Sequence, residues 1–224
     1  MKRIARAALA SAICLAGLYP LIAGADQGTP GVYTLNAQLL AGARAGDVDG
    51  VRRVVEQGAS INARNRGGNT ALLLFVEQGD AEMVSYLLEQ GADVNLANLE
   101  KVTPLMSAAH GGYADIARML IESGARVDAQ DQVFKTAMVY AAAAGNEALI
   151  RLLLDAGVDV NQRYRHQLTA LMWAAGYGKA EAVRTLLNAG AAPDLRDDRG
   201  KTARDIATEA GHGELAQLLD AAQP

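Results

Sequence analysis

Cysteine and aromatic residues are scarce in this sequence, and their scarcity narrows the chemistry that it can support. The 224-residue chain has a single cysteine, Cys14, and aromatic residues make up only 4% of it. Alanine, leucine and valine supply most of the apolar surface, a composition that suits thin, closely packed helices. It does not suit a β-sandwich, which requires more β-branched and aromatic residues.

Basic residues are also in the minority. The chain has 21 lysines and arginines against 25 aspartates and glutamates, which gives a formal net charge of −4. No run of basic residues occurs after the N-terminal few positions. The sequence therefore lacks the positive surface with which proteins attract nucleic acid, and we expect no nucleic-acid partner.

The N-terminus has the pattern of a secretory signal peptide. Basic residues at positions 2, 3 and 6 precede an apolar stretch at 7–18, and a small-x-small site that ends at Ala25 follows. Pro20 interrupts the apolar run before it reaches the roughly 18–20 residues that a membrane span needs. We expect cleavage after Ala25, with an uncleaved N-terminal anchor as the alternative.

Cleavage would place the mature protein in a bacterial periplasm or outside the cell. Residues 1–25 then form the signal peptide and 26–31 a short N-terminal linker. Because Cys14 lies in the removed segment, the mature chain has no cysteine. That excludes disulfides, thiolate catalysis and cysteine-ligated zinc, and we expect no membrane association after cleavage.

A 33-residue period runs through the rest of the chain and is marked by three sets of recurring residues. The sets are Thr70, Thr103, Thr136, Thr169 and Thr202; Gly46, Gly79, Gly112, Gly145, Gly178 and Gly211; and Gly58, Gly91, Gly124, Gly157 and Gly190. Three registers that agree indicate a true internal repeat. Its six units span about 32–64, 65–97, 98–130, 131–163, 164–196 and 197–222.

Each unit has the pattern helix, turn, helix, loop. The recurring threonine can cap the first helix, because its hydroxyl accepts a hydrogen bond from an otherwise unpaired backbone N–H. The first glycine suits the left-handed position at the end of that helix. A residue such as Asp80, directly after this glycine, can cap the second helix, which carries apolar pairs such as Leu120-Ile121.

These motifs resemble a known family. The segments Thr103-Pro104-Leu105, Ala108-Ala109, Gly112, Leu120-Ile121 and Gly124-Ala125 resemble the ankyrin repeat. Thr169 to Ala175 is similar to a variant of the same motif that is common in bacterial members. The resemblance covers residues 32–222 and implies an all-α solenoid of stacked helix-turn-helix units with projecting β-hairpin or loop fingers.

The departures from the family pattern are informative. The first unit has Ala37 in place of the threonine, and the last has Arg204-Asp205 where apolar residues are usual, as terminal repeats that face water should. The histidine that the family commonly places three residues after the threonine is absent throughout. Apolar residues such as Leu73 and Met106 stand there, so we expect apolar packing in place of a polar ladder.

Catalytic and metal-binding patterns are not found. The histidines His110, His166 and His212 do not have the spacing of metal ligands, and no serine has a nucleophile-elbow setting. The acidic residues are explained as helix caps or solvated helix faces. For Trp173, packing at a helix interface is favoured over a binding role. We therefore expect neither an enzyme nor a cofactor or metal site.

The projecting loops, or fingers, give the clearest sequence evidence for a binding site. Two residues before the threonine, Gly68 and Gly200 keep the family's glycine, whereas the three central units have Lys101, Phe134 and Gln167. If this position needs a positive φ, each non-glycine residue costs on the order of 1 kcal/mol. Apolar residues crowd the same loops, which favours a binding role over sequence drift or packing of finger against finger.

The predicted partner-binding residues are Leu99, Lys101, Val102, His110, Val133, Phe134, Tyr164, His166, Leu168 and Tyr177. If the fingers prove to pack within the solenoid, the alternative surface is the concave helix face around His110 and Tyr177. The resemblance implies a non-catalytic protein-interaction module, and we expect a monomer. Its role would be that of an accessory or protective partner of another exported protein. The alternatives are an immunity protein that neutralises a toxin and a secreted effector that binds a host or competitor protein.

Overall fold

The computed structural model describes residues 31–222. The predicted signal peptide, its cleavage site and the linker up to residue 30 lie outside the described residues. The described part is helical and contains no strand. Its elements are α1 (Val32–Ala45), α2 (Val48–Glu56), α3 (Ala71–Gln78), α4 (Ala81–Glu89), α5 (Pro104–Gly111), α6 (Ala114–Glu122), α7 (Ala137–Ala144), α8 (Glu147–Asp155), the 3-10 turn η1 (Arg165–Gln167), α9 (Ala170–Gly176), α10 (Ala180–Asn188), α11 (Ala203–Glu209) and α12 (Gly213–Ala221).

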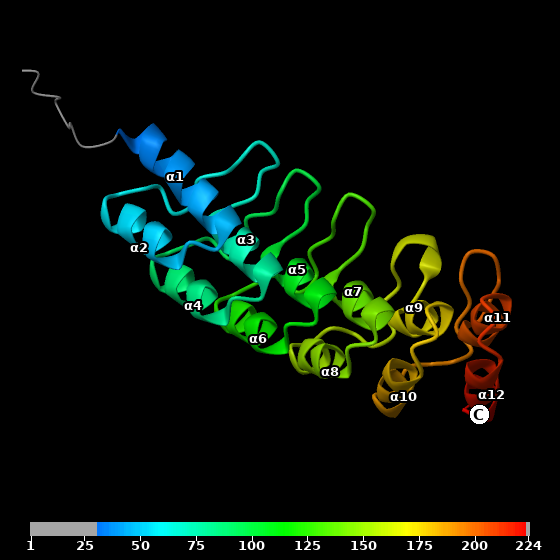
Figure 1. The fold of residues 1–224 in the computed structure, drawn as a ribbon. Coiled ribbons are helices and arrows are strands. Elements are labelled where there is room, and N and C mark those ends of the chain that lie inside the picture. The colour runs from blue at the N-terminus through cyan, green and yellow to red at the C-terminus, as the bar shows by residue number, and fades with distance from the viewer. Residues whose placement is uncertain (1–30, 223–224) are drawn as a thin grey trace, which may run out of the picture. The chain divides into compact units, whose positions relative to one another are not determined.

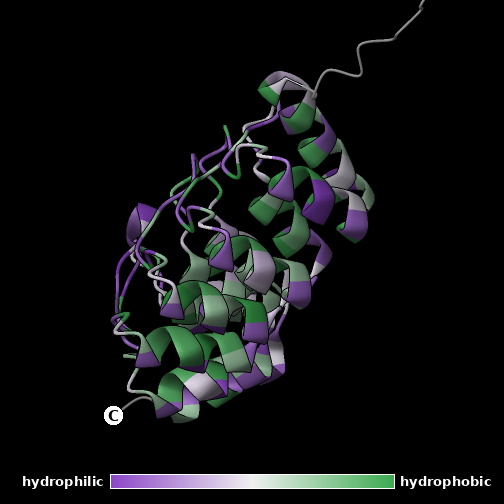
Figure 2. Ribbon diagram, turned by 90° about the vertical axis from the view of Figure 1, so that its left-hand side faces the viewer, coloured by the Kyte–Doolittle hydropathy of each residue, from purple (hydrophilic) through white to green (hydrophobic). Residues whose placement is uncertain are grey.

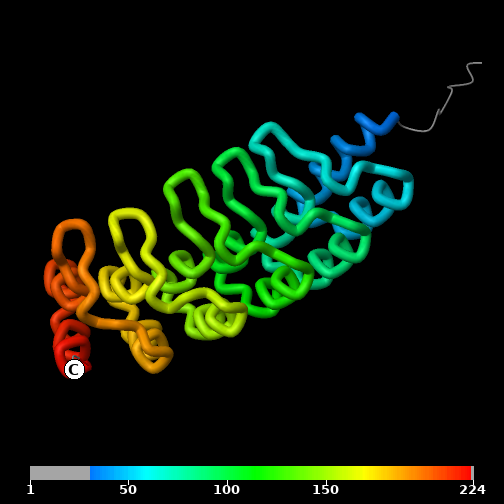
Figure 3. The backbone as a smooth tube through the Cα atoms, turned by 180° about the vertical axis from the view of Figure 1, so that it is seen from behind, coloured from blue at the N-terminus to red at the C-terminus, as the bar shows by residue number. Residues whose placement is uncertain are grey.

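The helices form two rows joined by projecting loops (Figure 1). Odd-numbered helices make an inner row and even-numbered helices an outer row, so that each unit contributes one helix to each. Five loops project side by side from the inner row (Figure 3). We call them the first to fifth finger loops, and they comprise residues 58–69, 91–102, 124–135, 157–168 and 190–201. They are loops rather than the β-hairpins that the resemblance allowed.

Local capping explains where the inner helices begin and end. The side chains of the five recurring threonines each accept a hydrogen bond from the backbone N–H three residues later, as with Thr70 and Leu73 at 3.2 Å. At the end of α3, Gly79 adopts a left-handed conformation with a φ of 73°. A Cβ there would also lie 2.7 Å from the ring of Tyr113, so both the backbone conformation and the close approach of this ring require glycine. Both predictions about capping are confirmed.

Apolar packing replaces the polar ladder, as the sequence predicts. Leu73, Met106, Val139 and Met172 are all buried at the position three residues after the threonine. In the last unit this position is Asp205, whose carboxylate instead accepts a hydrogen bond from the Thr202 N–H and completes a capping box. The hydrophobic residues lie mainly on the helices and the hydrophilic ones on the loops (Figure 2).

Candidate functional site

Four of the five finger loops have the same tight turn. In each, an Asn or Asp side chain accepts hydrogen bonds from the backbone N–H groups two and four residues later, which is an Asx-type turn. In the third loop, Asp131 Oδ1 accepts from Val133 and Lys135, both at 2.8 Å. The equivalent residues in the first, second and fifth loops are Asn65, Asn98 and Asp197.

The position two residues before the threonine is left-handed in every finger loop. Gly68 and Gly200 have φ values of 80° and 78°, and Lys101, Phe134 and Gln167 have values of 61°, 65° and 59°. The sequence prediction of a positive φ is thus confirmed. Each of the three non-glycine residues carries a strain of about 1 kcal/mol or more, which the rest of the loop must sustain.

Exposed apolar side chains gather on the second and third finger loops. Leu99 is 63% exposed and Phe134 is 51% exposed, with Val133 similarly placed. Lys101 is exposed beside them. The guanidinium of Arg165, from the fourth loop, lies 5.4 Å from the centre of the Phe134 ring, a cation–π contact between neighbouring loops.

The fourth finger loop differs from the prediction. Tyr164 is only 7% exposed, so the expectation that it lies at an exposed finger tip is wrong. Tyrosine stands at the Asx position and cannot accept the two backbone hydrogen bonds, so the loop forms the turn η1 and the ring packs into the core. Leu168 is half-buried against the same core, so it too packs within the solenoid and does not lie at an exposed finger tip. His166 is exposed and lies 2.8 Å from Asp198 of the fifth loop.

A row of aromatic rings runs along the inner helices beside the fingers. The rings of His110 (α5) and Tyr140 (α7) meet edge to face at 5.6 Å, and those of Trp173 (α9) and Tyr177, the residue that caps α9, stack at 6.1 Å. Lys135 connects the two pairs, because its Nζ lies 5.6 Å from the Tyr140 centroid and 5.2 Å from that of Trp173. The row therefore spans three units and already holds one cation.

A cleft of about 370 Å³ lies between this row and the second finger loop. It is lined by Glu77, Asn98, Glu100, Val102, Met106, Ser107, His110 and Tyr140. Val102 is half-buried here rather than fully exposed. Burial raises the pKa of Glu77. Burial also raises the pKa of Tyr140, and the hydrogen bond that its hydroxyl donates to Asp131 Oδ2, at 2.7 Å, adds to this effect.

We call the surface formed by these loops and rings the inner face. It comprises Leu99, Lys101, Val133, Phe134, Lys135, the aromatic row and the cleft residues. Two carboxylates in the cleft, those of Glu77 and Glu100, form no ion pair within residues 31–222. The inner face is therefore apolar and aromatic, with an acidic recess.

A family model described as ankyrin repeats (3 copies) matches residues 39–131 and 138–223, which is most of the chain. The chain belongs to the ankyrin repeat family. Ankyrin repeats indicate a protein–protein interaction module. No protein in the curated set that was searched matches the chain significantly.

The ankyrin stack brings together some predicted residues and adds others. His110 and Tyr177 belong to the aromatic row, and Leu99, Val133 and Phe134 lie at neighbouring finger tips. Tyr140 is not among the predicted residues, and for Trp173 the sequence favours packing over a binding role. Both stand four residues after the capping threonine of their units, a register in which an aromatic residue faces the fingers, and that spacing is the signal that could have found them.

Within residues 31–222, His, Cys, Asp and Glu side chains nowhere gather in groups of three or more that could hold a metal ion. None of the helices in this range has both the length and the hydropathy of a membrane span.

Proposed function

We propose that this ankyrin repeat protein binds another exported protein through its inner face and acts in the periplasm as a non-catalytic accessory or protective partner. One observation carries the proposal. Of the six large hydrophobic side chains that are exposed in the described residues, Leu99, Val133, Phe134 and Tyr177 lie on the inner face. Exposed apolar groups concentrated on one face are typical of protein-binding surfaces.

Two further features support the proposal. Lys101 and Phe134 keep their side chains at left-handed positions where glycine would be less strained, and this supports a use of these side chains outside folding. The rings of the aromatic row are large and mostly anchored by their neighbours, and such residues carry much of the binding energy in known interfaces. The secretory pattern of the N-terminus supports the periplasmic location.

Affinity capture with matched variants tests the role of the inner face. The chain from Asp26 onward is immobilised and exposed to periplasmic extract, and bound proteins are identified by mass spectrometry. Replacing Leu99 and Tyr177 by alanine should weaken a specific partner by roughly 1–3 kcal/mol per residue. Arg118→Ala, on the exposed side of the outer helix α6, is the control and should leave capture unchanged. Equal capture by the double variant and the wild type would reject the inner face.

The location is tested separately. Protein released by osmotic shock is subjected to N-terminal sequencing, and we expect the sequence to begin at Asp26. Recovery of the chain in the membrane fraction with Met1 intact would contradict cleavage and support an N-terminal anchor.

A further inference from the structure

Hydrogen bonds tie neighbouring finger loops together at every junction but one in the described chain. Backbone bonds join Leu99 N–H to the Gly67 carbonyl at 2.9 Å, Gln132 to Glu100 at 3.0 Å and Asp198 to His166 at 3.0 Å. The equivalent bond from Arg165 to Val133, between the third and fourth loops, is absent. This junction is held by the Arg165–Phe134 side-chain contact instead.

A second kind of tie is missing at the same junction. At the other junctions an asparagine Oδ1 accepts from a backbone N–H of the next loop: Asn62 from Asp93 at 2.8 Å, Asn95 from Arg126 at 2.9 Å and Asn161 from Ala192 at 2.9 Å. The residue in this register at the junction of the third and fourth loops is Asp128. The backbone N–H in the donor register belongs to Asp159, and the Asp128 side chain accepts no hydrogen bond from it.

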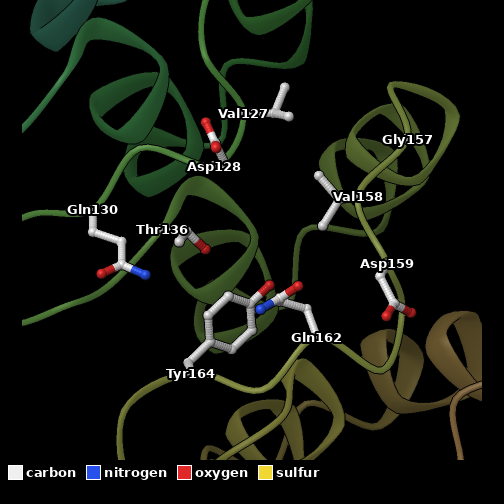
Figure 4. Close-up of a pocket in the computed structure, with 9 residues that line it drawn as sticks. All are labelled: Val127, Asp128, Gln130, Thr136, Gly157, Val158, Asp159, Gln162 and Tyr164. Atoms are coloured by element: carbon white, nitrogen blue, oxygen red, sulfur yellow. The ribbon is translucent and has the colours of Figure 1, made fainter.

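A cavity of about 390 Å³ lies at this junction (Figure 4), and a smaller one of about 330 Å³ lies in the same register at the junction before it. The larger cavity is lined by Val127, Asp128, Gln130, Thr136, Gly157, Val158, Asp159, Gln162 and Tyr164. None of these residues is shared with the cleft of the inner face. We call it the seam cavity.

Polar groups in the seam cavity lack partners. The Asp128 carboxylate makes no ion pair or hydrogen bond within the described residues, and the Asp159 carboxylate accepts only from the Asn161 N–H, at 2.9 Å. The Tyr164 hydroxyl is buried and has only a weak interaction with the Thr136 side chain, outside normal hydrogen-bond geometry. A polar group of a residue that is only 7% exposed, such as the Tyr164 hydroxyl, requires an explanation when it lacks a good partner. Asp128 and Asp159 are exposed, and no basic residue lines the seam cavity, although Asp128 also lines a neighbouring cavity with Lys101 and Arg126.

We propose that the seam cavity binds a small organic diammonium ion. The carboxylates of Asp128 and Asp159 belong to opposite loops, so an ammonium group on each would neutralise both and link the loops. Val127 and Val158 provide apolar contact for the methylene chain between the two charges. The Tyr164 hydroxyl and the glutamine carbonyls can accept the remaining N–H bonds. The bound ion replaces the two ties that are absent at Asp128 and Arg165.

Thermal unfolding and calorimetric titration with putrescine test the proposal on the chain from Asp26 onward, at constant ionic strength. Putrescine should bind and raise the melting temperature, whereas butanediol, which has the same chain without charge, should do neither. Asp128→Asn and Asp159→Asn should each weaken binding by about tenfold or more, because each removes one of the two charge partners. Tyr164→Phe, which deletes only the hydroxyl, should weaken it by a smaller factor.

The repeat supplies a matched control. Asp194 occupies the register of Asp128 in the fifth finger loop and, like Asp128, is exposed, but it does not line the seam cavity. Asp194→Asn therefore removes the same charge outside the cavity and should leave binding unchanged. An equal loss of binding in Asp194→Asn would show a general attraction of cations to an acidic protein and would overturn the site. So would an equal effect of sodium ions at matched charge. Partner capture by the inner face uses other residues, so either proposal can fail alone.

Discussion

The third and fourth finger loops occupy the same place in the repeat and have the same length, yet they are stabilised in different ways. In the third loop, Asp131 accepts two backbone hydrogen bonds and the hydroxyl of Tyr140, so polar contacts set its shape. In the fourth loop, Tyr164 stands in that register, buries its ring and leaves the turn to η1. One residue type therefore decides whether a loop is ordered by its own backbone or by the core beneath it.

The largest effect is expected at Tyr164. Replacing it by alanine removes a buried aromatic ring and should lower the free energy of unfolding by about 3 kcal/mol, measured by urea denaturation. Tyr177→Ala, which truncates a ring that is 53% exposed, should cost much less. Similar losses in the two variants would mean that the fourth loop does not depend on burial of Tyr164.

The next effect is expected in the third loop. Asp131→Ala leaves two backbone N–H groups and the Tyr140 hydroxyl without their acceptor, and should cost about 1–2 kcal/mol in the same measurement. Asp131→Asn retains the Oδ1 acceptor, as Asn98 does in the second loop, and should recover most of the loss. A variant with asparagine that is as unstable as the alanine variant would contradict the Asx turn as the source.

The fifth loop should be sensitive to acid through Asp197. Burial raises the pKa of Asp197, but hydrogen bonds from the Lys201 N–H and from Arg199 lower it by more than burial raises it. The pKa of Asp197 therefore lies below its usual value. Its contribution to stability is therefore fully present above the unfolded-state pKa of about 3.9 and is lost as pH falls through the lower folded-state value.

Asp197→Asn tests this contribution. It keeps the turn acceptor and loses the ion pair with Arg199, so it should cost up to about 1 kcal/mol at neutral pH, because the arginine is half-exposed. The difference from the wild type should vanish in strong acid, as followed by urea denaturation across pH. A difference that is constant with pH would assign the effect to packing instead.

The smallest effect concerns the strained positions. Phe134→Gly relieves a non-glycine residue at a φ of 65° and should raise the free energy of unfolding slightly, by about 0.5 kcal/mol after the entropy of glycine is included. Partner affinity should fall at the same time, because the exposed ring is lost. Lower stability with unchanged binding would instead make Phe134 a packing residue of the solenoid.

Much of the fold could be predicted because its signals are local. A threonine cap acts on an N–H three residues away, and the left-handed positions of Gly79 or Lys101 depend on the turn in which they stand. A 33-residue period repeats these signals often enough to exclude coincidence. The exposed finger residues Leu99 and Phe134 were predicted on the same basis, because a position at the tip of a short turn has few neighbours.

The sequence by itself determined the repeat, its helix boundaries and the backbone conformation at the finger tips. Only the tertiary structure decided which side chains of neighbouring units meet. The burial of Tyr164, the missing ties around Asp128 and the aromatic row through Tyr140 all depend on contacts between residues about one repeat apart. An aromatic side chain packs against a neighbouring unit when burial of its ring stabilises the fold more than local hydrogen bonds in the turn would. How the repeat units stack decides how much of the ring can be buried.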